Sequence, residues 1–93
     1  MNRHSDAVVL LHGFLGSSSD WSDVVDRLGA GLSFITPDLP GHGNTRLPAP
    51  EPTMRMVVEW LHGVVQSAGS DRVVLVGYSM GGRIAMHYAL AHP

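Results

Sequence analysis

The sequence predicts an α/β domain with a parallel sheet, and three observations support this class. Short apolar runs at residues 7–11, 32–36 and 72–77 are typical of buried strands. A stretch with helical spacing of apolar residues follows each run. Strands that alternate with helices pair in parallel, with helices on both faces of the sheet. The expected element order is therefore β-α-β-α-β-α.

Composition narrows the class of protein. At 93 residues the chain makes at most one small domain. Six arginines against eight acidic residues give a net charge of −2, which argues against a nucleic-acid or anionic-membrane surface. There is no cysteine, so a disulfide or thiolate metal site is impossible. No apolar run is long enough to span a bilayer and the N-terminus has no signal-peptide layout, so we expect a cytoplasmic protein.

The first half of the chain predicts a strand, a helix and a second strand. Ala7–Leu11 is a continuous apolar run, as expected of a strand buried on both faces. Ser19 or Asp20 is the expected N-cap of the helix, and Gly29 or Gly31 ends it. The apolar face of this helix consists of Trp21, Val24, Val25 and Leu28. Residues 32–36 form the second strand, closed by Pro37.

The second half predicts a long loop, a helix, a strand and a last helix. Residues 37–52 are rich in proline and glycine and read as loop. Thr53 is the expected N-cap of the next helix. One face of that helix carries Val57, Trp60, Leu61, Val64 and Ala68, and we expect Trp60, like Trp21, in the core. The strand 72–77 and the helix 80–92 follow.

A serine stands at the corner between that strand and that helix. Residues 77–81, Gly-Tyr-Ser-Met-Gly, fit the pattern G-x-S-x-G. A nucleophile on such a tight turn has a strained backbone, and side chains two residues away on either side would collide. Gly77 and Gly81 remove those collisions and leave the Ser79 hydroxyl exposed at the sheet edge. We therefore expect Ser79 to be the catalytic nucleophile, with a plain turn hydroxyl as the alternative.

Two further motifs follow the first and second strands. His12-Gly13 ends the first, and Gly13 allows the backbone N–H of Phe14 to turn toward the serine. Together with the N–H of Met80 it would form a two-donor oxyanion hole. The second motif, Asp-Leu-Pro-Gly-His-Gly, spans residues 38–43. We expect His12 to brace the oxyanion loop and His42 its own turn, because two histidines without a carboxylate pair make a poor metal site.

These three motifs resemble the α/β-hydrolase fold over residues 7–93. The resemblance implies that the strands are the third, fourth and fifth of that fold, in the spatial order four, three, five. A Rossmann-like nucleotide binder is disfavoured, because "HGFLGS" lacks the G-x-G-x-x-G spacing. Within the superfamily, "LHGFLGSSSDW", "DLPGHG" and "VGYSMGGRIAM" look most like the 2-succinyl-6-hydroxy-2,4-cyclohexadiene-1-carboxylate synthases of menaquinone biosynthesis.

That closer resemblance implies a lyase that eliminates pyruvate from a small anionic substrate and needs no cofactor. It also implies that Arg83, at i+4 from Ser79, binds a substrate carboxylate. A solvated arginine or an internal salt bridge is the alternative. Tyr78 either contacts substrate or packs in the core. A serine carboxylesterase or carbon–carbon bond hydrolase of the same fold, and a non-catalytic remnant, remain open as functions, and oligomeric state is left open.

The triad acid and base are missing from the sequence. In this fold they follow the serine along the chain. After Ser79 there is no Asp or Glu, and His87 and His92 lie on the helix that runs away from the serine. Without a base, serine is a weak nucleophile. We therefore expect residues 1–93 to be the N-terminal part of a single α/β-hydrolase domain, without cap or later strands, and inactive alone.

Overall fold

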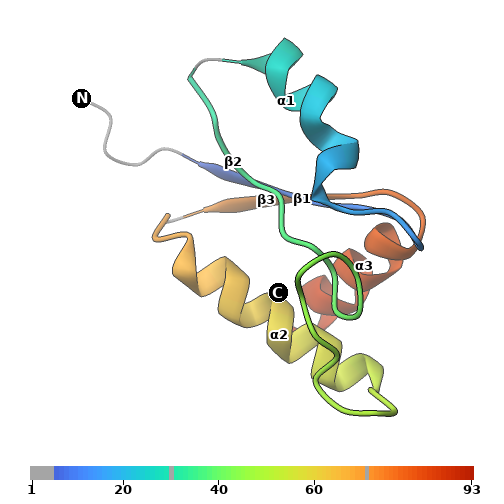
Figure 1. Cartoon of the computed structure of the whole chain (residues 1–93). Coiled ribbons are helices and arrows are strands. Elements are labelled where there is room, and N and C mark those ends of the chain that lie inside the picture. The colour runs from blue at the N-terminus through green and yellow to red at the C-terminus, as the bar shows by residue number, and fades with distance from the viewer. Residues whose placement is uncertain (1–5, 30, 71) are drawn as a thin grey trace.

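The computed structural model describes residues 6–29, 31–70 and 72–93 (Figure 1). The elements follow the predicted alternation of strands and helices. In chain order they are β1 (Ala7–Leu11), a 3-10 helix (Ser18–Trp21), α1 (Ser22–Leu28), β2 (Ser33–Ile35), α2 (Met54–Ser67), β3 (Val73–Gly77) and α3 (Met80–Ala91).

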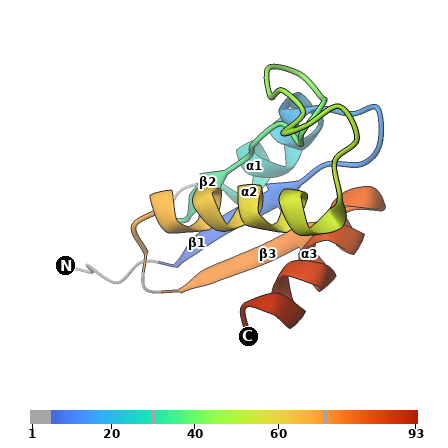
Figure 2. The same cartoon turned by 90° about the horizontal axis from the view of Figure 1, so that it is seen from below.

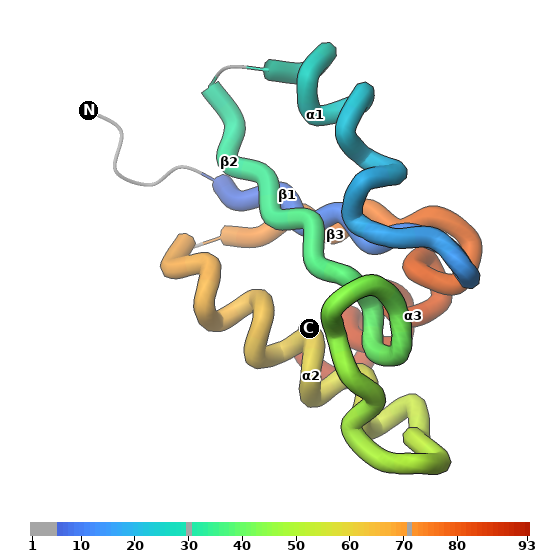
Figure 3. Tube along the Cα trace, viewed as in Figure 1, coloured from blue at the N-terminus to red at the C-terminus, as the bar shows by residue number. Residues whose placement is uncertain are grey.

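The three strands form one parallel sheet in the order β2-β1-β3. Ala7 is in register with Ser33 on one side and with Val73 on the other, and Leu11 is opposite Gly77. This confirms the spatial order that the resemblance implied. Helix α1 lies on one face of the sheet, whereas α2 and α3 lie on the other (Figure 1). The loop between β2 and α2 lies at the C-terminal end of the strands (Figures 2 and 3).

The hydrophobic core lies between the sheet and the α2–α3 pair. Its buried members are Val9, Leu11, Leu39, Val58, Leu61, Ile84 and Tyr88. Trp60 packs against this cluster but is only half-buried, as is Trp21, so the prediction that both are core residues was too strong. Val9, Leu10 and Leu11 of β1 are inaccessible, which confirms the prediction that residues 7–11 form a strand buried on both faces.

The α1 face of the sheet is much less covered, so the strand at residues 73–77 is not fully buried as its apolar run predicted. Helix α1 buries none of its residues, and Val24 and Leu28 on its apolar face are 38% and 56% exposed. Val74 and Val76 of β3 are also exposed, at 47% and 39%. The physical reason is position: β3 is an edge strand of the described sheet, with α2 and α3 covering only one of its faces.

The ends of α1 and α2 agree with the predicted caps, with one exception. Thr53 caps α2 as predicted, since its Oγ1 accepts the Met56 N–H at 3.2 Å. Gly29 ends α1 with φ of 57°. The prediction of Ser19 or Asp20 as the N-cap of α1 was wrong. A 3-10 turn intervenes with Ser17 at its N-cap, because the Asp20 carboxylate reaches back to the Ser17 N–H at 3.3 Å.

Candidate functional site

Ser79 stands at the end of β3, at the N-cap position of α3, and its backbone is strained. Its φ of 55° and ψ of −113° put a non-glycine residue in the sparsely populated positive-φ half of the conformational map, which costs on the order of 1–3 kcal/mol. Neighbouring hydrogen bonds hold the corner: the Tyr78 N–H donates to the Leu11 carbonyl at 3.0 Å, and the Arg83 N–H to the Ser79 carbonyl at 3.1 Å. The side chain of Ser79 is exposed, so its hydroxyl is accessible.

The glycines around the serine are required by close backbone approach. A Cβ on Gly77 would stand 2.5 Å from the Gly81 carbonyl and the Gly82 nitrogen. A Cβ on Gly81 would collide with the Leu11 carbonyl oxygen and stand 2.6 Å from that of His12. A side chain at either glycine would therefore collide with backbone, and the collisions involve the neighbouring elements rather than the serine itself. They allow α3 to begin directly against the end of β1.

Gly13 lies on the other side of the corner. A Cβ on it would stand 2.9 Å from the Tyr78 ring and 3.5 Å from the Ser79 Cβ. The loop after β1 therefore packs directly on the serine corner. The prediction that Gly13 lets the Phe14 N–H turn toward Ser79 requires the loop to lie this close to the serine.

A hollow of about 370 Å³ opens beside Ser79. It is lined by Phe14, Met54, Ser79, Met80 and Arg83, so the structure brings together the predicted nucleophile, both predicted oxyanion donors and the predicted substrate arginine. Along the described chain, the N–H groups of Phe14 and Met80 donate to no backbone or side-chain acceptor outside the regular elements. Two free donors beside an exposed hydroxyl can bind negative charge that develops on an oxygen.

Arg83 is exposed on α3, one turn after Ser79. Among the described residues no carboxylate forms an ion pair with it. The alternative of an internal salt bridge therefore finds no support in the part of the chain that the structure describes. A guanidinium that no carboxylate of the described residues engages can bind a substrate carboxylate through two parallel hydrogen bonds.

Met54 is the lining residue that the sequence reasoning missed. It is the first residue of α2, and its side chain is 38% exposed in the hollow. Its helix start was predicted from Thr53, but its place beside Ser79 depends on how the loop 37–53 returns to the strand ends. The sequence carried no local signal for that return.

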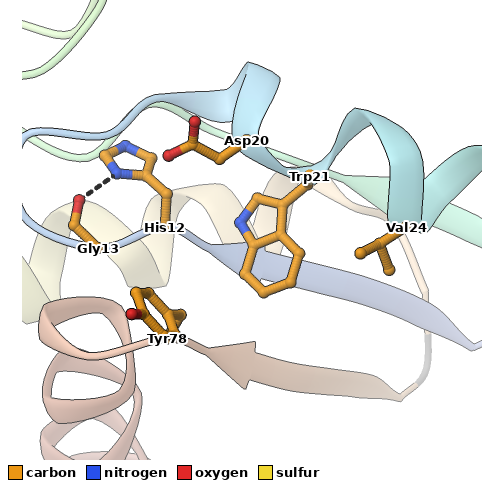
Figure 4. A pocket seen from close by; sticks show the side chains of 6 residues that line it. All are labelled: His12, Gly13, Asp20, Trp21, Val24 and Tyr78. Carbon is orange, nitrogen blue, oxygen red and sulfur yellow. Dashed lines mark hydrogen bonds between the residues drawn. The ribbon is translucent and has the colours of Figure 1, made fainter.

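Tyr78 lies apart from this hollow. It is 68% exposed, so packing in the core is excluded as its role. It lines a second space of about 240 Å³ with His12, Gly13, Asp20, Trp21 and Val24 (Figure 4). Tyr78 and Ser79 are adjacent in sequence yet line different spaces. The structure thus does not bring Tyr78 into the hollow that holds Ser79 and Arg83.

Asp38 acts as a structural carboxylate at the end of the second strand region. Its Oδ1 accepts the Ser18 N–H at 2.8 Å and its Oδ2 accepts the Asn44 N–H at 3.0 Å. These backbone hydrogen bonds, that of Asn44 first, hold the pKa of Asp38 below its ordinary value. Asp38 therefore joins the start of the 3-10 turn to the loop after β2.

Metal and membrane sites were not expected. Over residues 6–29, 31–70 and 72–93, no group of three or more histidine, aspartate or glutamate side chains is placed to hold a metal ion. None of the described helices is long and apolar enough to cross a bilayer.

Comparison with known proteins identifies relatives of this arrangement. The sequence model of a family described as "alpha/beta hydrolase fold" matches residues 6–93. A 2-succinyl-6-hydroxy-2,4-cyclohexadiene-1-carboxylate synthase of Yersinia enterocolitica is 42% identical over 85 residues, which cover 88% of this chain and 29% of that protein. A pimeloyl-[acyl-carrier protein] methyl ester esterase of Aromatoleum aromaticum is 41% identical over 93 residues, covering 100% of this chain and 34% of that one.

Solved structures agree with the sequence comparison. The structure of a marine microorganism esterase superposes with a TM-score of 0.86 at 29% identity, over 96% of this chain and 34% of that one. The chain spans about a third or less of the length of the curated relatives that it matches.

Proposed function

The chain belongs to the alpha/beta hydrolase family, and from this premise we propose that the full-length protein is a cytoplasmic 2-succinyl-6-hydroxy-2,4-cyclohexadiene-1-carboxylate synthase. The substrate would be a small polyanion that loses pyruvate. The 42% identical relative from Yersinia enterocolitica carries that activity in its name. No cofactor enters the proposal, since the chemistry is proton transfer and electrostatic stabilisation.

The observation that carries the proposal is Arg83. Its guanidinium lines the same hollow as Ser79 and has no carboxylate partner among the described residues. A cation beside the reacting group favours an anionic substrate, whereas a neutral ester gains nothing from it. Helices α2 and α3 both begin at this hollow, with Met54 and Met80, and neither carries an acidic residue in its first turn. The positive ends of both helix dipoles thus remain uncompensated by acidic side chains of their own first turns.

The proposed step is an elimination. A base takes a proton from a substrate carbon, a new carbon–carbon double bond forms, and the carbon–oxygen bond to the departing group breaks, so that pyruvate leaves as its enolate and then takes up a proton. Negative charge that spreads onto a substrate oxygen would be stabilised by the N–H groups of Phe14 and Met80. Arg83 would pair with a substrate carboxylate and orient it. Ser79 would act with the triad acid and base, which no residue after Ser79 in this chain provides.

Ester hydrolysis is the second candidate, because a methyl ester esterase is 41% identical over the whole chain. In that case Ser79 would attack an ester carbonyl and the two N–H donors would hold the tetrahedral oxyanion. The serine corner and the donors serve both reactions equally. Arg83 is the residue that separates them.

The test measures both reactions with the full-length protein. Pyruvate release from the enolpyruvyl precursor is followed with a coupled dehydrogenase, and hydrolysis of a neutral aryl ester is followed by absorbance. We expect Arg83→Gln to raise KM for the anionic substrate roughly 10- to 100-fold, through loss of a charge-assisted pair. Arg27→Gln, at an exposed arginine of α1, is the matched control and should change neither reaction.

Each outcome has a meaning. Ester turnover without pyruvate release would replace the synthase by the esterase. Arg83→Gln with unchanged KM for the anionic substrate would remove the observation on which the proposal rests. If neither reaction occurs and a fluorophosphonate probe fails to label Ser79, the protein is a non-catalytic member of the family.

A further inference from the structure

Two histidines join the loop after β1 to the loop after β2. His12 follows β1 and is 1% exposed. Its Nε2 accepts the Leu39 N–H at 2.9 Å, so this nitrogen carries no proton. Its Nδ1 must then carry the proton, which it donates to the Gly13 carbonyl at 2.8 Å. His12 is therefore a neutral ring with both nitrogens in use.

His42 makes the equivalent pair of hydrogen bonds from the other loop. It lies in the loop after β2, and its Nε2 accepts the Leu15 N–H at 3.0 Å. Its Nδ1 therefore holds the proton and donates to the Pro40 carbonyl at 3.1 Å. Each histidine thus closes a turn in its own loop and accepts an N–H from the other loop. The two rings meet edge to face, with centroids 5.2 Å apart.

The N–H that His42 accepts belongs to a strained residue. Leu15 has φ of 65°, a left-handed conformation that costs a non-glycine residue roughly 1–2 kcal/mol. Its side chain is 81% exposed, so packing of that side chain does not stabilise the conformation. The hydrogen bond to His42 and the bond from the Gly16 N–H to the Gly13 carbonyl at 3.0 Å are what hold this turn.

Phe14 lies directly before Leu15 and lines the hollow beside Ser79. Its ring packs edge to face on His42, with centroids 5.9 Å apart, although 68% of the side chain is exposed. His42 therefore contacts this loop twice, through the hydrogen bond from the Leu15 N–H and through the ring of Phe14. These two contacts fix the direction of the Phe14 N–H. Donors for a developing oxyanion act only when they are held in position before the reaction.

We propose that His42 is a positioning residue for the oxyanion site: its unprotonated Nε2 holds the Leu15 N–H and thereby fixes the N–H of Phe14 beside Ser79. The inference rests on the proposed function in one respect, namely that the hollow is the reaction site. It holds equally for the elimination and for ester hydrolysis, because both place negative charge on a substrate oxygen. His12, which is buried, joins the same two loops at a second point, where its Nε2 accepts the Leu39 N–H.

The first experiment reads the tautomer directly. In full-length protein with ¹⁵N-labelled histidine, ¹⁵N chemical shifts identify which ring nitrogen carries the proton. We expect His42 to be neutral with the proton on Nδ1, and a scalar coupling across the hydrogen bond between the Leu15 nitrogen and the His42 Nε2. A proton on Nε2 would overturn the proposal whatever the reaction turns out to be.

The second experiment separates the acceptor from the ring. His42→Phe keeps the ring volume and removes the acceptor, whereas His42→Gln places an amide oxygen near the position of Nε2. We expect His42→Phe to lower kcat about 10- to 100-fold with KM within about 3-fold, because a misplaced donor weakens transition-state binding rather than substrate binding. His42→Gln should restore most of the rate. The matched control is His87→Phe at an exposed position of α3, which should behave as wild type.

The outcomes distinguish this proposal from the proposed function. The rate at which a fluorophosphonate probe labels Ser79 gives a readout that does not depend on the natural substrate. Slow labelling of His42→Phe with rescue by His42→Gln supports the positioning role even if no pyruvate is released. Equal rates for wild type and His42→Phe overturn it, as does an equal loss in both variants, which would indicate packing. If His42→Phe does not fold, the tautomer measurement on wild type decides.

Discussion

Gly77→Ala is the sharpest test of how the serine corner is built. The new Cβ would stand 2.5 Å from the carbonyl carbon and oxygen of Gly81 and from the nitrogen of Gly82, whereas ordinary contact begins at 3.4 Å. All three atoms belong to the backbone, so no flexible side chain can move aside. The start of α3 must retreat from β3 by roughly 0.9 Å, and overpacking of this kind costs ~3 kcal/mol.

Two other glycines give a graded series for the same substitution. A Cβ on Gly82 would stand 3.2 Å from the Gly77 carbonyl oxygen, which requires a shift of only a few tenths of an ångström. A Cβ on Gly63, within α2, meets nothing within 4 Å. Because alanine is the better helix former, Gly63→Ala should stabilise the protein by up to ~1 kcal/mol. Gly82→Ala should fall between the two.

The assay is urea unfolding of the full-length protein, together with the rate of fluorophosphonate labelling of Ser79. Gly77→Ala should lower the free energy of unfolding and slow labelling by about 10- to 100-fold, since a shift near 1 Å misplaces the reacting group. Gly63→Ala should leave labelling unchanged. Unfolding of Gly77→Ala at the same urea concentration as Gly63→Ala would mean that close backbone approach does not explain the glycine at position 77.

Three further predictions concern stability. Thr53→Ala removes the acceptor of the Met56 N–H and should cost ~1 kcal/mol in urea unfolding, with Thr53→Ser as the conservative control. The lowered pKa of Asp38 means that its stabilising contribution is present above its unfolded value near 3.8 and is lost as pH falls through the lower folded value. Acid titrations should therefore show a steeper loss of stability for wild type than for Asp38→Asn. Tyr88→Phe removes the hydroxyl that lies 2.9 Å from the His62 Nδ1 and should cost ~1 kcal/mol, measured by thermal unfolding.

The sequence predicted what depends on near neighbours along the chain. The strand Ala7–Leu11, the Thr53 cap and the Gly29 helix end each follow from a few adjacent residues, and the structure confirms them. The G-x-S-x-G corner belongs to the same group. Its strain and its need for small residues follow from a turn of five residues, and the φ of 55° at Ser79 agrees with the expected strained backbone.

What escaped prediction depends on elements that are distant in sequence. Helical spacing marked an apolar face on α1, but spacing cannot tell whether another element covers that face, and Val24 and Leu28 remain exposed. The Ser17 cap was missed because four successive residues, 17–20, can all cap a helix, and the reach of the Asp20 carboxylate decided between them. Met54 reached the hollow through a loop whose path no local pattern specifies.

His12 and His42 also make contacts that local sequence could not predict. Each was expected to brace its own loop, and each does, through its Nδ1. That each also accepts an N–H from the other loop follows from the sheet order, which places β1 beside β2 and brings residues 27 positions apart into contact.

The end of β1 is the point where these contacts converge. The Leu11 carbonyl accepts the Tyr78 N–H and is also the group that a Cβ on Gly81 would strike. One residue later, His12 binds the loop after β2 through Leu39. A displacement of the strand end would thus move the serine corner and both loops together. Because residues that share partners couple energetically, substitutions at Gly81 and His12 should combine non-additively, whereas either should add to one at Gly63. The position of Ser79 relative to the N–H groups of Phe14 and Met80 is consequently set by the central strand rather than by the serine turn alone.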